Sequence, residues 1–218
     1  MTITQQRQLA PRIYEMTLSG HLVQEMKKSG QFLHIRVPRE DMLLRRPISI
    51  NHIDREAGTC RIIYRTEGEG TKVFAQLQAG EQLDVLGPLG NGFDLSQIQA
   101  GDEVYIIGGG IGIPPLYELS RRILALGAVP IHFLGFASKE VMYYTEEFKA
   151  LGECRFATDD GSFGVHGNVG NLLLTALAAE GYGDNPPAAV FACGNNGMLK
   201  TVDQLFSDHP NAQISLES

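Results

Sequence analysis

The spacing of apolar residues changes near Gly101, and this change limits the folds open to the chain. Between Gln8 and about Leu95, apolar and polar residues mostly alternate with a period of two, in short runs separated by turn residues. Such runs are typical of half-buried strands and predict an antiparallel barrel or sandwich. After Gly101, short apolar strands alternate with amphipathic helices, which predicts a doubly wound parallel sheet. We therefore expect two domains, a β-barrel at residues 1–97 and an α/β domain at residues 98–218.

The expected elements follow from these two patterns. In the first domain we expect strands at 13–18, 32–37, 48–51, 60–65 and 81–86 and a short helix at 71–77. In the second domain we expect strands at 103–107, 129–136, 154–158, 188–192 and 213–216 and helices at 114–126, 144–151, 171–180 and 197–206. Thr71 is expected near the N-cap of the short helix, and Gly127 is expected to end the first long helix. The apolar face of that long helix is predicted to comprise Leu116, Leu119, Ile123 and Leu126.

The composition of the 218 residues excludes several classes of function. The formal net charge is −7 and there is no basic tail, so the chain has no electrostatic footprint for nucleic acid. It has no apolar run long enough for a membrane helix and no apolar signal-peptide core. Its three cysteines form no CxxC pair and its six histidines show no metal spacing. A cytoplasmic protein without metal, nucleic-acid or membrane partners is the expectation.

The segment at residues 108–115, Gly-Gly-Gly-Ile-Gly-Ile-Pro-Pro, follows an apolar run. Glycines let a ligand approach the backbone, and prolines suit the first turn of a helix, whose N–H groups attract phosphate. A plain tight turn is the alternative. The segment departs from the standard dinucleotide fingerprint, because Ile113 replaces the third glycine and no acidic residue ends the next strand. The residues alone predict a phosphate-bearing ligand without naming it.

Three predicted strands of the second domain end in distinctive loops, at residues 108–112, 159–164 and 193–196. Ligands of parallel sheets bind beyond the carboxyl ends of the strands, so we expect these loops on one rim. Asp159 and Asp160 are either a pair of catalytic carboxylates or, as Asp-Asp-Gly-Ser favours, a turn. Cys193 is either a nucleophile or, at such a rim, a contact to a nucleotide.

Two segments of the first domain have the residues of a phosphate site. Arg45 and Arg46 precede Pro47, which favours a strand start or an edge. Their guanidinium groups either grip a phosphate or form a solvated pair at a strand end. The Glu-Gly-Glu-Gly loop before Thr71 is either a second phosphate loop or an ordinary one.

In their order along the chain these motifs resemble those of the ferredoxin reductase-like flavoproteins. The matching segments are Arg46-Pro-Ile-Ser49, Gly70-Thr71, residues 108–115, and Cys193-Gly194 with Met198-Leu199. The resemblance extends from Ser29-Gly-Gln-Phe32 to the last predicted strand. Within this superfamily the chain is most similar to the electron transfer subunits of dihydroorotate dehydrogenase type B, through residues 45–50, 64–71 and the ending 214–218.

The resemblance implies an FAD-binding barrel followed by an NAD-binding domain. In such a barrel Arg46 would bind the FAD pyrophosphate, and Gly70 and Thr71 would place a helix N-terminus on the same group. Ser49 would lie near the flavin N5 atom, where hydride is exchanged. The further flavin contacts implied by the resemblance are Pro47, Ile48, Ile63, Tyr64 and Arg65.

The resemblance also implies where NAD would bind. The loop residues that would hold the NAD pyrophosphate are Gly108, Gly109, Gly110, Ile111, Gly112 and Pro114. Cys193 and Gly194 would approach the nicotinamide, with Cys193 as a catalytic contact. Asp160, Gly161 and Met198 complete the expected set. Ser138 and Lys139 are a weak signal for a 2′-phosphate, so NAD is favoured over NADP.

By the same resemblance, the protein is an NAD-linked flavoprotein reductase subunit in pyrimidine biosynthesis. It would pass electrons from an FMN-containing dihydroorotate dehydrogenase catalytic subunit to NAD⁺ within a heterotetramer. The alternatives are a related subunit of an electron-bifurcating, hydrogenase or sulfite reductase complex, and a non-redox nucleotide-binding module.

Two departures from the family pattern carry expectations of their own. Asn195 replaces the family's proline after Cys193-Gly194, which predicts a freer loop. The family chain continues into a cysteine-rich segment that binds a [2Fe–2S] cluster, which needs four closely spaced thiolates. This chain stops at Ser218 and its three cysteines lie far apart, so no cluster is expected in it.

Overall fold

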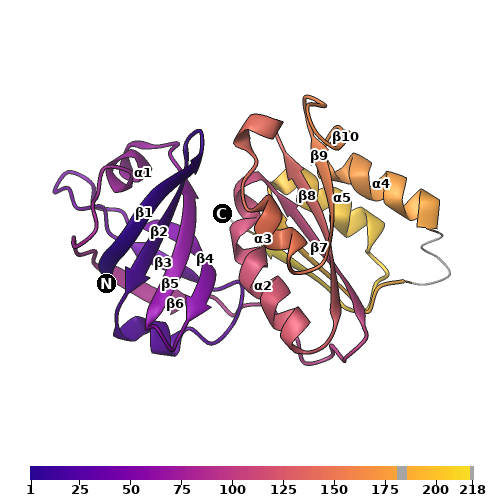
Figure 1. Cartoon of the computed structure of the whole chain (residues 1–218), viewed down its shortest axis with the longest axis horizontal. Helices are drawn as coiled ribbons and strands as arrows, with labels where there is room; N and C mark the ends of the chain where they lie inside the picture. The colour runs from indigo at the N-terminus through magenta and orange to yellow at the C-terminus, as the bar shows by residue number, and fades with distance from the viewer. Residues whose placement is uncertain (181–185, 217–218) are drawn as a thin grey trace. The chain divides into compact units, whose positions relative to one another are not determined.

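The structure, a computed structural model, describes residues 1–180 and 186–216. The chain forms two compact units, Met1–Gly92 and Phe93–Ser218, which Figure 1 shows in indigo to magenta and in pink to yellow. Each unit is built on one six-stranded sheet, antiparallel in the first and parallel in the second. The two predicted fold classes are therefore confirmed. Among the residues described, no helix is long and apolar enough to cross a membrane.

The first unit is a barrel-like antiparallel sheet. Its strands are β1 (Thr2–Ala10), β2 (Ile13–Ser19), β3 (Phe32–Ile35), β4 (Arg46–Asp54), β5 (Thr59–Arg65) and β6 (Val85–Leu89), in the order β1-β2-β5-β4-β3-β6. Gln82, just before β6, bridges Thr2 of β1 and brings the two ends of this order together. The 3₁₀ helix η1 (His21–Glu25) and the helix α1 (Glu69–Phe74) complete the unit. Phe74 of α1 belongs to the buried core, so α1 covers the barrel from one side.

Several expectations for the barrel are corrected by the structure. Strand β1 was not predicted as a whole, because its run of glutamines hides the alternation. The short helix begins at Glu69 with Gly68 as its N-cap, while the Thr71 hydroxyl donates to the Gly68 carbonyl within the first turn. The strand expected at 81–86 lies at Val85–Leu89, because residues 81–83 turn aside to pair with the start of β1.

Pro47 is the second residue of β4, which confirms the predicted strand start. An edge position is wrong, because β4 lies between β5 and β3. Pro47 is opposite His34 of β3, whereas pairing with β5 begins only at Ile50. A residue without an N–H is therefore tolerated where the strand has a partner on one side only.

The second unit is a parallel sheet with helices on both faces (Figure 1). Its strands are β7 (Glu103–Gly109), β8 (Val129–Phe136), β9 (Glu153–Thr158), β10 (Val165–His166), β11 (Ala189–Gly194) and β12 (Ala212–Leu216). The helices are α2 (Pro114–Ala125), α3 (Thr145–Lys149), α4 (Val169–Glu180) and α5 (Asn196–Leu205), with 3₁₀ turns η2 (Gly110–Gly112) and η3 (Lys139–Val141). Helices α4 and α5 share one hydrophobic core with one face of the sheet, and α2 and α3 cover the other face.

The strand order β10-β9-β8-β7-β11-β12 contains one reversal. The chain moves outward from β7 through β8 and β9, then returns to place β11 on the other side of β7. Every neighbouring pair is parallel, so the loops after β7, β9 and β11 lie on one rim, as predicted. The reversal between β7 and β11 is the position where doubly wound sheets bind ligands.

Most elements of the second unit lie within two residues of their expected bounds, and the exceptions have local causes. The helix expected at 144–151 is only Thr145–Lys149, because Tyr144 has a left-handed backbone. Gly127 follows α2 at φ +80°, as expected for a terminating glycine. Leu126 is 45% exposed, while Leu116, Leu119 and Ile123 are buried as predicted. The short β10 was not predicted, and Glu217 and Ser218 of the resembling ending lie outside the described residues.

His132 of β8 joins three elements beneath the sheet surface. Its Nε2 lies 2.9 Å from the Ser120 hydroxyl of α2, and its Nδ1 lies 2.9 Å from the carbonyl oxygen of Glu153 in β9. The imidazole is completely buried, and this burial lowers the pKa of His132 to about 4. A neutral histidine donates from Nδ1 to the Glu153 carbonyl, while the Ser120 hydroxyl beside Nε2 itself donates to the Leu116 carbonyl at 2.7 Å. His132 is therefore a residue of the buried core.

We expect His132 to make the second unit lose stability in acid. The folded protein binds fewer protons than the unfolded chain between the folded pKa of about 4 and the unfolded value of 6.5. The free energy of unfolding therefore falls as the pH is lowered from 6.5 toward 4, by about 3 kcal/mol in all. Urea unfolding across this range should show a smaller loss for His132→Asn than for the wild type. His166→Asn, at an exposed site, serves as the control. If His132→Asn lost as much unfolding free energy between pH 6.5 and pH 4 as the wild type, the role given to His132 would be contradicted.

Candidate functional site

In the first unit the structure brings Arg46 and Gly70 into contact. A Cβ atom added to Gly70 would lie 2.7 Å from Arg46 Nε and 3.1 Å from its Cζ. The guanidinium group therefore lies directly on the backbone of the first turn of α1. The Arg46 Nη1 also donates to the carbonyl oxygen of Leu44 at 2.8 Å, which fixes the direction of the side chain. A cationic fork beside the start of a helix is a suitable environment for a phosphate.

Arg45 has a different role from its neighbour. Its Nη1 donates to the Asp84 carbonyl at 3.0 Å, and its Nη2 donates to the Asp84 carboxylate at 2.8 Å. This hydrogen bond lowers the pKa of Asp84. Arg45 thus ties the start of β4 to the residue before β6. Of the two arginines considered from the sequence, only Arg46 lies against α1.

The other flavin-site residues lie on β4 and β5. Ser49 is half-buried and opposite Phe32, Pro47 is exposed, and Ile48 packs against the barrel core. The remaining predicted contacts on β5 are Ile63, Tyr64 and Arg65. The first two are almost completely buried, and the Tyr64 hydroxyl donates to Gln6 Oε1 at 3.0 Å, so both side chains belong to the packed interior.

The buried Nε of Arg65 lacks a hydrogen-bond partner among the described residues. Arg65 ends β5, and the loop after it leads into α1 at Gly68 and Glu69. A buried donor without a partner is costly, so an acceptor from outside the protein would stabilise it. Together with the contact between Arg46 and Gly70, this donor fits the phosphate-bearing part of a dinucleotide.

In the second unit the loops after β7 and β11 touch through their backbones. A Cβ atom added to Gly112 would lie 2.5 Å from the carbonyl oxygen of Cys193 and 2.5 Å from the nitrogen of Gly194. Gly108 is closely packed as well, because an added Cβ would lie 2.7 Å from a side-chain carbon of Leu116 in α2. Gly110 has φ +54° and open space where a side chain would be. Gly112 thus allows the two loops to touch, Gly108 allows the helix to pack closely, and Gly110 allows a left-handed turn.

Met198 lies across the same two loops. Its Sδ would be 2.8 Å from a Cβ on Gly109 and 2.8 Å from a Cβ on Gly194. Its backbone N–H donates to the Asn195 side chain at 2.9 Å, and this makes Asn195 the N-cap of α5. The loop is therefore held by a cap, while the freer loop expected from the replacement of proline stays a prediction. An asparagine just before a helix is a recognised N-cap signal, so the sequence contained the information needed.

The structure thus gathers most of the predicted NAD residues at the reversal between β7 and β11. Ile111 lies in η2, and Pro114 begins the twelve-residue helix α2. Cys193 is completely buried at the end of β11, so the parts of its loop nearest the rim are Gly194 and Asn195.

Asp160 and Gly161 lie farther along the rim, beyond β9. The Asp160 carboxylate accepts from the Ser162 N–H at 3.0 Å and from the Ser162 hydroxyl at 2.6 Å. The side-chain hydrogen bond from Ser162 lowers the pKa of Asp160. Gly161 has φ +71°, so the turn interpretation of Asp-Asp-Gly-Ser is confirmed. The Ser162 hydroxyl also accepts from the Lys139 N–H at 2.7 Å, which links the loops after β8 and β9.

Tyr143 is a residue of this site that sequence reasoning missed. Its hydroxyl donates to the Gly110 carbonyl at 2.8 Å, although the two residues lie on separate segments after β8 and β7. Neither the spacing nor the residue type predicts this contact, because only the fold brings the segments together.

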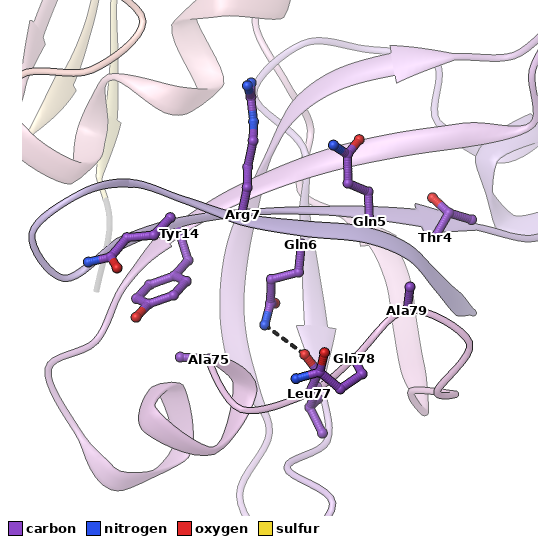
Figure 2. A pocket seen from close by; sticks show the side chains of 10 residues that line it. Thr4, Gln5, Gln6, Arg7, Tyr14, Ala75, Leu77, Gln78 and Ala79 are labelled. Atoms are coloured by element: carbon purple, nitrogen blue, oxygen red, sulfur yellow. Dashed lines mark hydrogen bonds between the residues drawn. The ribbon is translucent and has the colours of Figure 1, made fainter.

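A pocket of about 340 Å³ lies elsewhere, between β1 and the segment after α1 (Figure 2). None of the residues that line it is a predicted site residue. Gln6 fills it from β1 and donates to the carbonyls of Phe74 and Leu77, both at 3.0 Å. These bonds hold α1 against the barrel, so the pocket belongs to the structural frame of the first unit.

The three cysteines lie in different strands, Cys60 in β5, Cys154 in β9 and Cys193 in β11. Within residues 1–180 and 186–216, no three acidic, histidine or cysteine side chains gather closely enough to hold a metal ion.

Comparison with known proteins identifies close relatives. Residues 4–93 match the family described as oxidoreductase FAD-binding domain. The whole chain is 64% identical to the dihydroorotate dehydrogenase B (NAD(+)) electron transfer subunit of Enterococcus faecalis V583 and covers 81% of that protein. The proteins of the same name from Bacillus caldolyticus and Streptococcus pneumoniae R6 are 47% and 44% identical, and the chain covers 82% of each.

Solved structures share the fold at lower identity. A NADH-dependent reduced ferredoxin-NADP oxidoreductase superposes with a TM-score of 0.82 at 24% identity, over 99% of this chain and 75% of the other. A ferredoxin NADP+ reductase from Neisseria gonorrhoeae with bound FAD and NADP gives 0.78 at 19% identity, over 98% and 96% of the two chains. The predicted ferredoxin reductase-like fold is therefore confirmed.

We expect Gly112→Ala to destabilise the second unit by about 2 kcal/mol, because the new methyl group would overlap backbone atoms that have no rotamer to change. Thermal unfolding followed by circular dichroism measures the loss. Gly197→Ala, at the neighbouring end of α5, is the matched control. Its Cβ would lie 3.3 Å from the side-chain oxygen of Asn195, a milder approach than 2.5 Å to backbone atoms, and alanine favours the helix, so its loss of stability should be much smaller. Equal stability of the two variants would contradict the close loop contact.

Proposed function

The chain belongs to the family of dihydroorotate dehydrogenase B (NAD(+)) electron transfer subunits, and from this we infer that it passes electrons between a catalytic dihydroorotate dehydrogenase subunit and NAD in pyrimidine biosynthesis. It is an FAD-dependent, NAD-linked oxidoreductase subunit. The observation that carries this conclusion is identity of 44% to 64% over the full chain. The two candidate sites supply independent support, because each fits the phosphates of a dinucleotide.

We propose that residues 1–97 form the FAD-binding domain. Arg46 and the backbone of Gly70 and Thr71 bind the FAD pyrophosphate, with Arg65 Nε as a further donor. This assignment is supported by the contact between Arg46 and Gly70 and by the buried Arg65 donor. Ser49 lies near the flavin N5 atom, and the remaining flavin contacts in this proposal are Pro47, Ile48, Ile63 and Tyr64, the last two through their backbone.

We propose that residues 98–218 form the NAD-binding domain, with the cofactor lying across the carboxyl ends of the strands. The glycine loop and the N-terminus of α2 bind the pyrophosphate. The nicotinamide lies on the β11 side, where it contacts Cys193, Gly194 and Met198. The adenosine half then lies toward β8 and β9, where Asp160 and Gly161 stand. This direction is supported by the strand order, which places β11 and β8 on opposite sides of β7.

The acidic residue on the adenosine side supports NAD rather than NADP. Asp160 is kept ionised by its hydrogen bonds from Ser162, so its charge would repel a 2′-phosphate and its oxygens would accept from a ribose hydroxyl. Of the two residues considered for binding a 2′-phosphate, Ser138 and Lys139, the lysine has its Nζ 5.9 Å from the centre of the Phe163 ring. The relatives' names specify NAD(+).

FAD, when bound, supplies the chemistry that links a two-electron nicotinamide to a partner's redox centre. The residues of this chain bind and orient the two dinucleotides. The partner is a catalytic dihydroorotate dehydrogenase subunit, as the relatives' name implies. We propose that this partner contains FMN and that the complex is a heterotetramer. We also propose a cytoplasmic location, because the described structure contains no disulfide.

The visible spectrum of the purified protein tests the function. We expect bound FAD, which anaerobic NADH should bleach and NADPH should bleach at least tenfold more slowly. In a separate sample with oxidised flavin and no NADH, the catalytic subunit and dihydroorotate together should also reduce the flavin. A protein that binds no FAD, or whose flavin does not respond to NADH, would refute the proposal.

The neighbouring arginines provide a sharper test of the flavin site. We expect Arg46→Ala to weaken FAD binding by about tenfold to a hundredfold, because it removes charge-assisted hydrogen bonds to phosphate. Arg45→Ala is the matched control and should change the FAD dissociation constant by less than about threefold, because Arg45 binds Asp84. Titration of the apoprotein with FAD, followed by flavin fluorescence, measures both. Equal losses in the two variants would remove the assigned role of Arg46.

A further inference from the structure

Tyr143 connects two loops of the second unit that are distant in sequence. It lies between η3 and α3, and its hydroxyl donates to the Gly110 carbonyl at 2.8 Å. The side chain is only 6% exposed and its ring packs edge-on against Phe136 at 5.7 Å. Its position is therefore determined by the sheet beneath it.

The residue after Tyr143 has an unusual backbone. Tyr144 has φ 60° and ψ 18°, a left-handed conformation that is unfavourable for an aromatic residue. Its ring is 4% exposed and packs against Tyr117 of α2 at 5.1 Å. The packing of Tyr144 thus maintains a turn that sends one tyrosine against α2 and leaves Tyr143 directed at the glycine loop.

The hydrogen bond from Tyr143 determines the orientation of one peptide group. The Gly110 carbonyl accepts from Tyr143 and also from the Ile113 N–H at 3.3 Å. Because the peptide unit is planar and trans, fixing this carbonyl directs the Ile111 N–H to the opposite side. Gly110 is left-handed and begins the 3₁₀ turn η2, a combination that makes successive N–H groups converge as in an anion-binding nest.

We propose that Tyr143 is a positioning residue of the NAD site, which orients the Gly110–Ile111 peptide so that the Ile111 N–H binds the cofactor's pyrophosphate. The inference rests on the proposed function, because it requires NAD at the glycine loop. It adds a role that the glycine motif itself does not contain. The space on the Cβ side of Gly110 is open, because no atom beyond the two adjacent residues lies within 4 Å of an added Cβ, so the backbone of Gly110 is not covered there.

The test is Tyr143→Phe, which removes the hydroxyl and keeps the ring. The loss of one hydrogen bond is about 1 kcal/mol, so the dissociation constants for NAD⁺ and ADP-ribose should each rise about fivefold. The constant for AMP, which lacks the pyrophosphate, should stay unchanged, and so should the FAD content. Tyr105→Phe is the matched control, because Tyr105 is a buried tyrosine that packs on Phe133 in the core with α4 and α5. Calorimetric titration of the holoprotein measures all three ligands.

The outcomes separate this inference from the proposed function. Equal affinities for ADP-ribose in Tyr143→Phe and the wild type, or an equal loss for AMP, would overturn the role of Tyr143 alone. Failure of the wild type to bind NAD⁺ and ADP-ribose would overturn the proposed function and this inference together. A second measurement needs no variant: in the wild type, the Ile111 amide proton signal should shift with ADP-ribose and remain in place with AMP. No shift with ADP-ribose would overturn the inference even if Tyr143→Phe did not fold.

Discussion

The second unit depends on the contact between Gly112 and the backbone of Cys193 and Gly194. Two strands that are neighbours in the sheet, β7 and β11, end at the same level, and their loops meet with no side chain between them. The contact joins the two loops at the reversal of strand order. The space beyond the carboxyl ends of the strands remains for a ligand. Met198 can then lie across both loops, and α2 and α5 can both begin at this point. Any side chain at Gly112 would separate all of these parts.

The first unit also contains a glycine whose missing side chain allows a close contact, but the contact is with a side chain. Gly70 is also required by close approach, but the atoms it meets belong to the Arg46 side chain. A guanidinium group can move a little, whereas a backbone carbonyl cannot. In the proposed assignment, the phosphate site of the barrel would therefore adjust to its ligand, while that of the α/β unit would keep the shape set by the backbone. The adjacent Arg45 differs in its neighbours, since it is hydrogen-bonded to Asp84 whereas Arg46 lies against Gly70.

Sequence reasoning reached the fold class and the motif order because these depend on local patterns. The strand at 129–136 has its predicted bounds, because a continuous apolar run between turn residues is typical of a buried strand. Strand β1 was missed because its pairing, rather than its composition, makes it a strand. The resemblance pointed to Arg46, but the structural role of Arg45 needed the position of Asp84, and the contact of Tyr143 with Gly110 needed the approach of two loops. Asn195 is different, because its capping role was available from the sequence.

The hydrogen bond between Tyr143 and Gly110 has a consequence for modularity. Glycine-rich loops are often treated as portable motifs that carry their binding function with them. Here the carbonyl that sets the loop's conformation is held by a residue from the next crossover, and that residue is placed by a strained neighbour packed on α2. A transplant of this loop would therefore have to include the whole crossover from β7 to α3, because the loop without Tyr143 would have the glycines but lack the hydrogen bond to the Gly110 carbonyl.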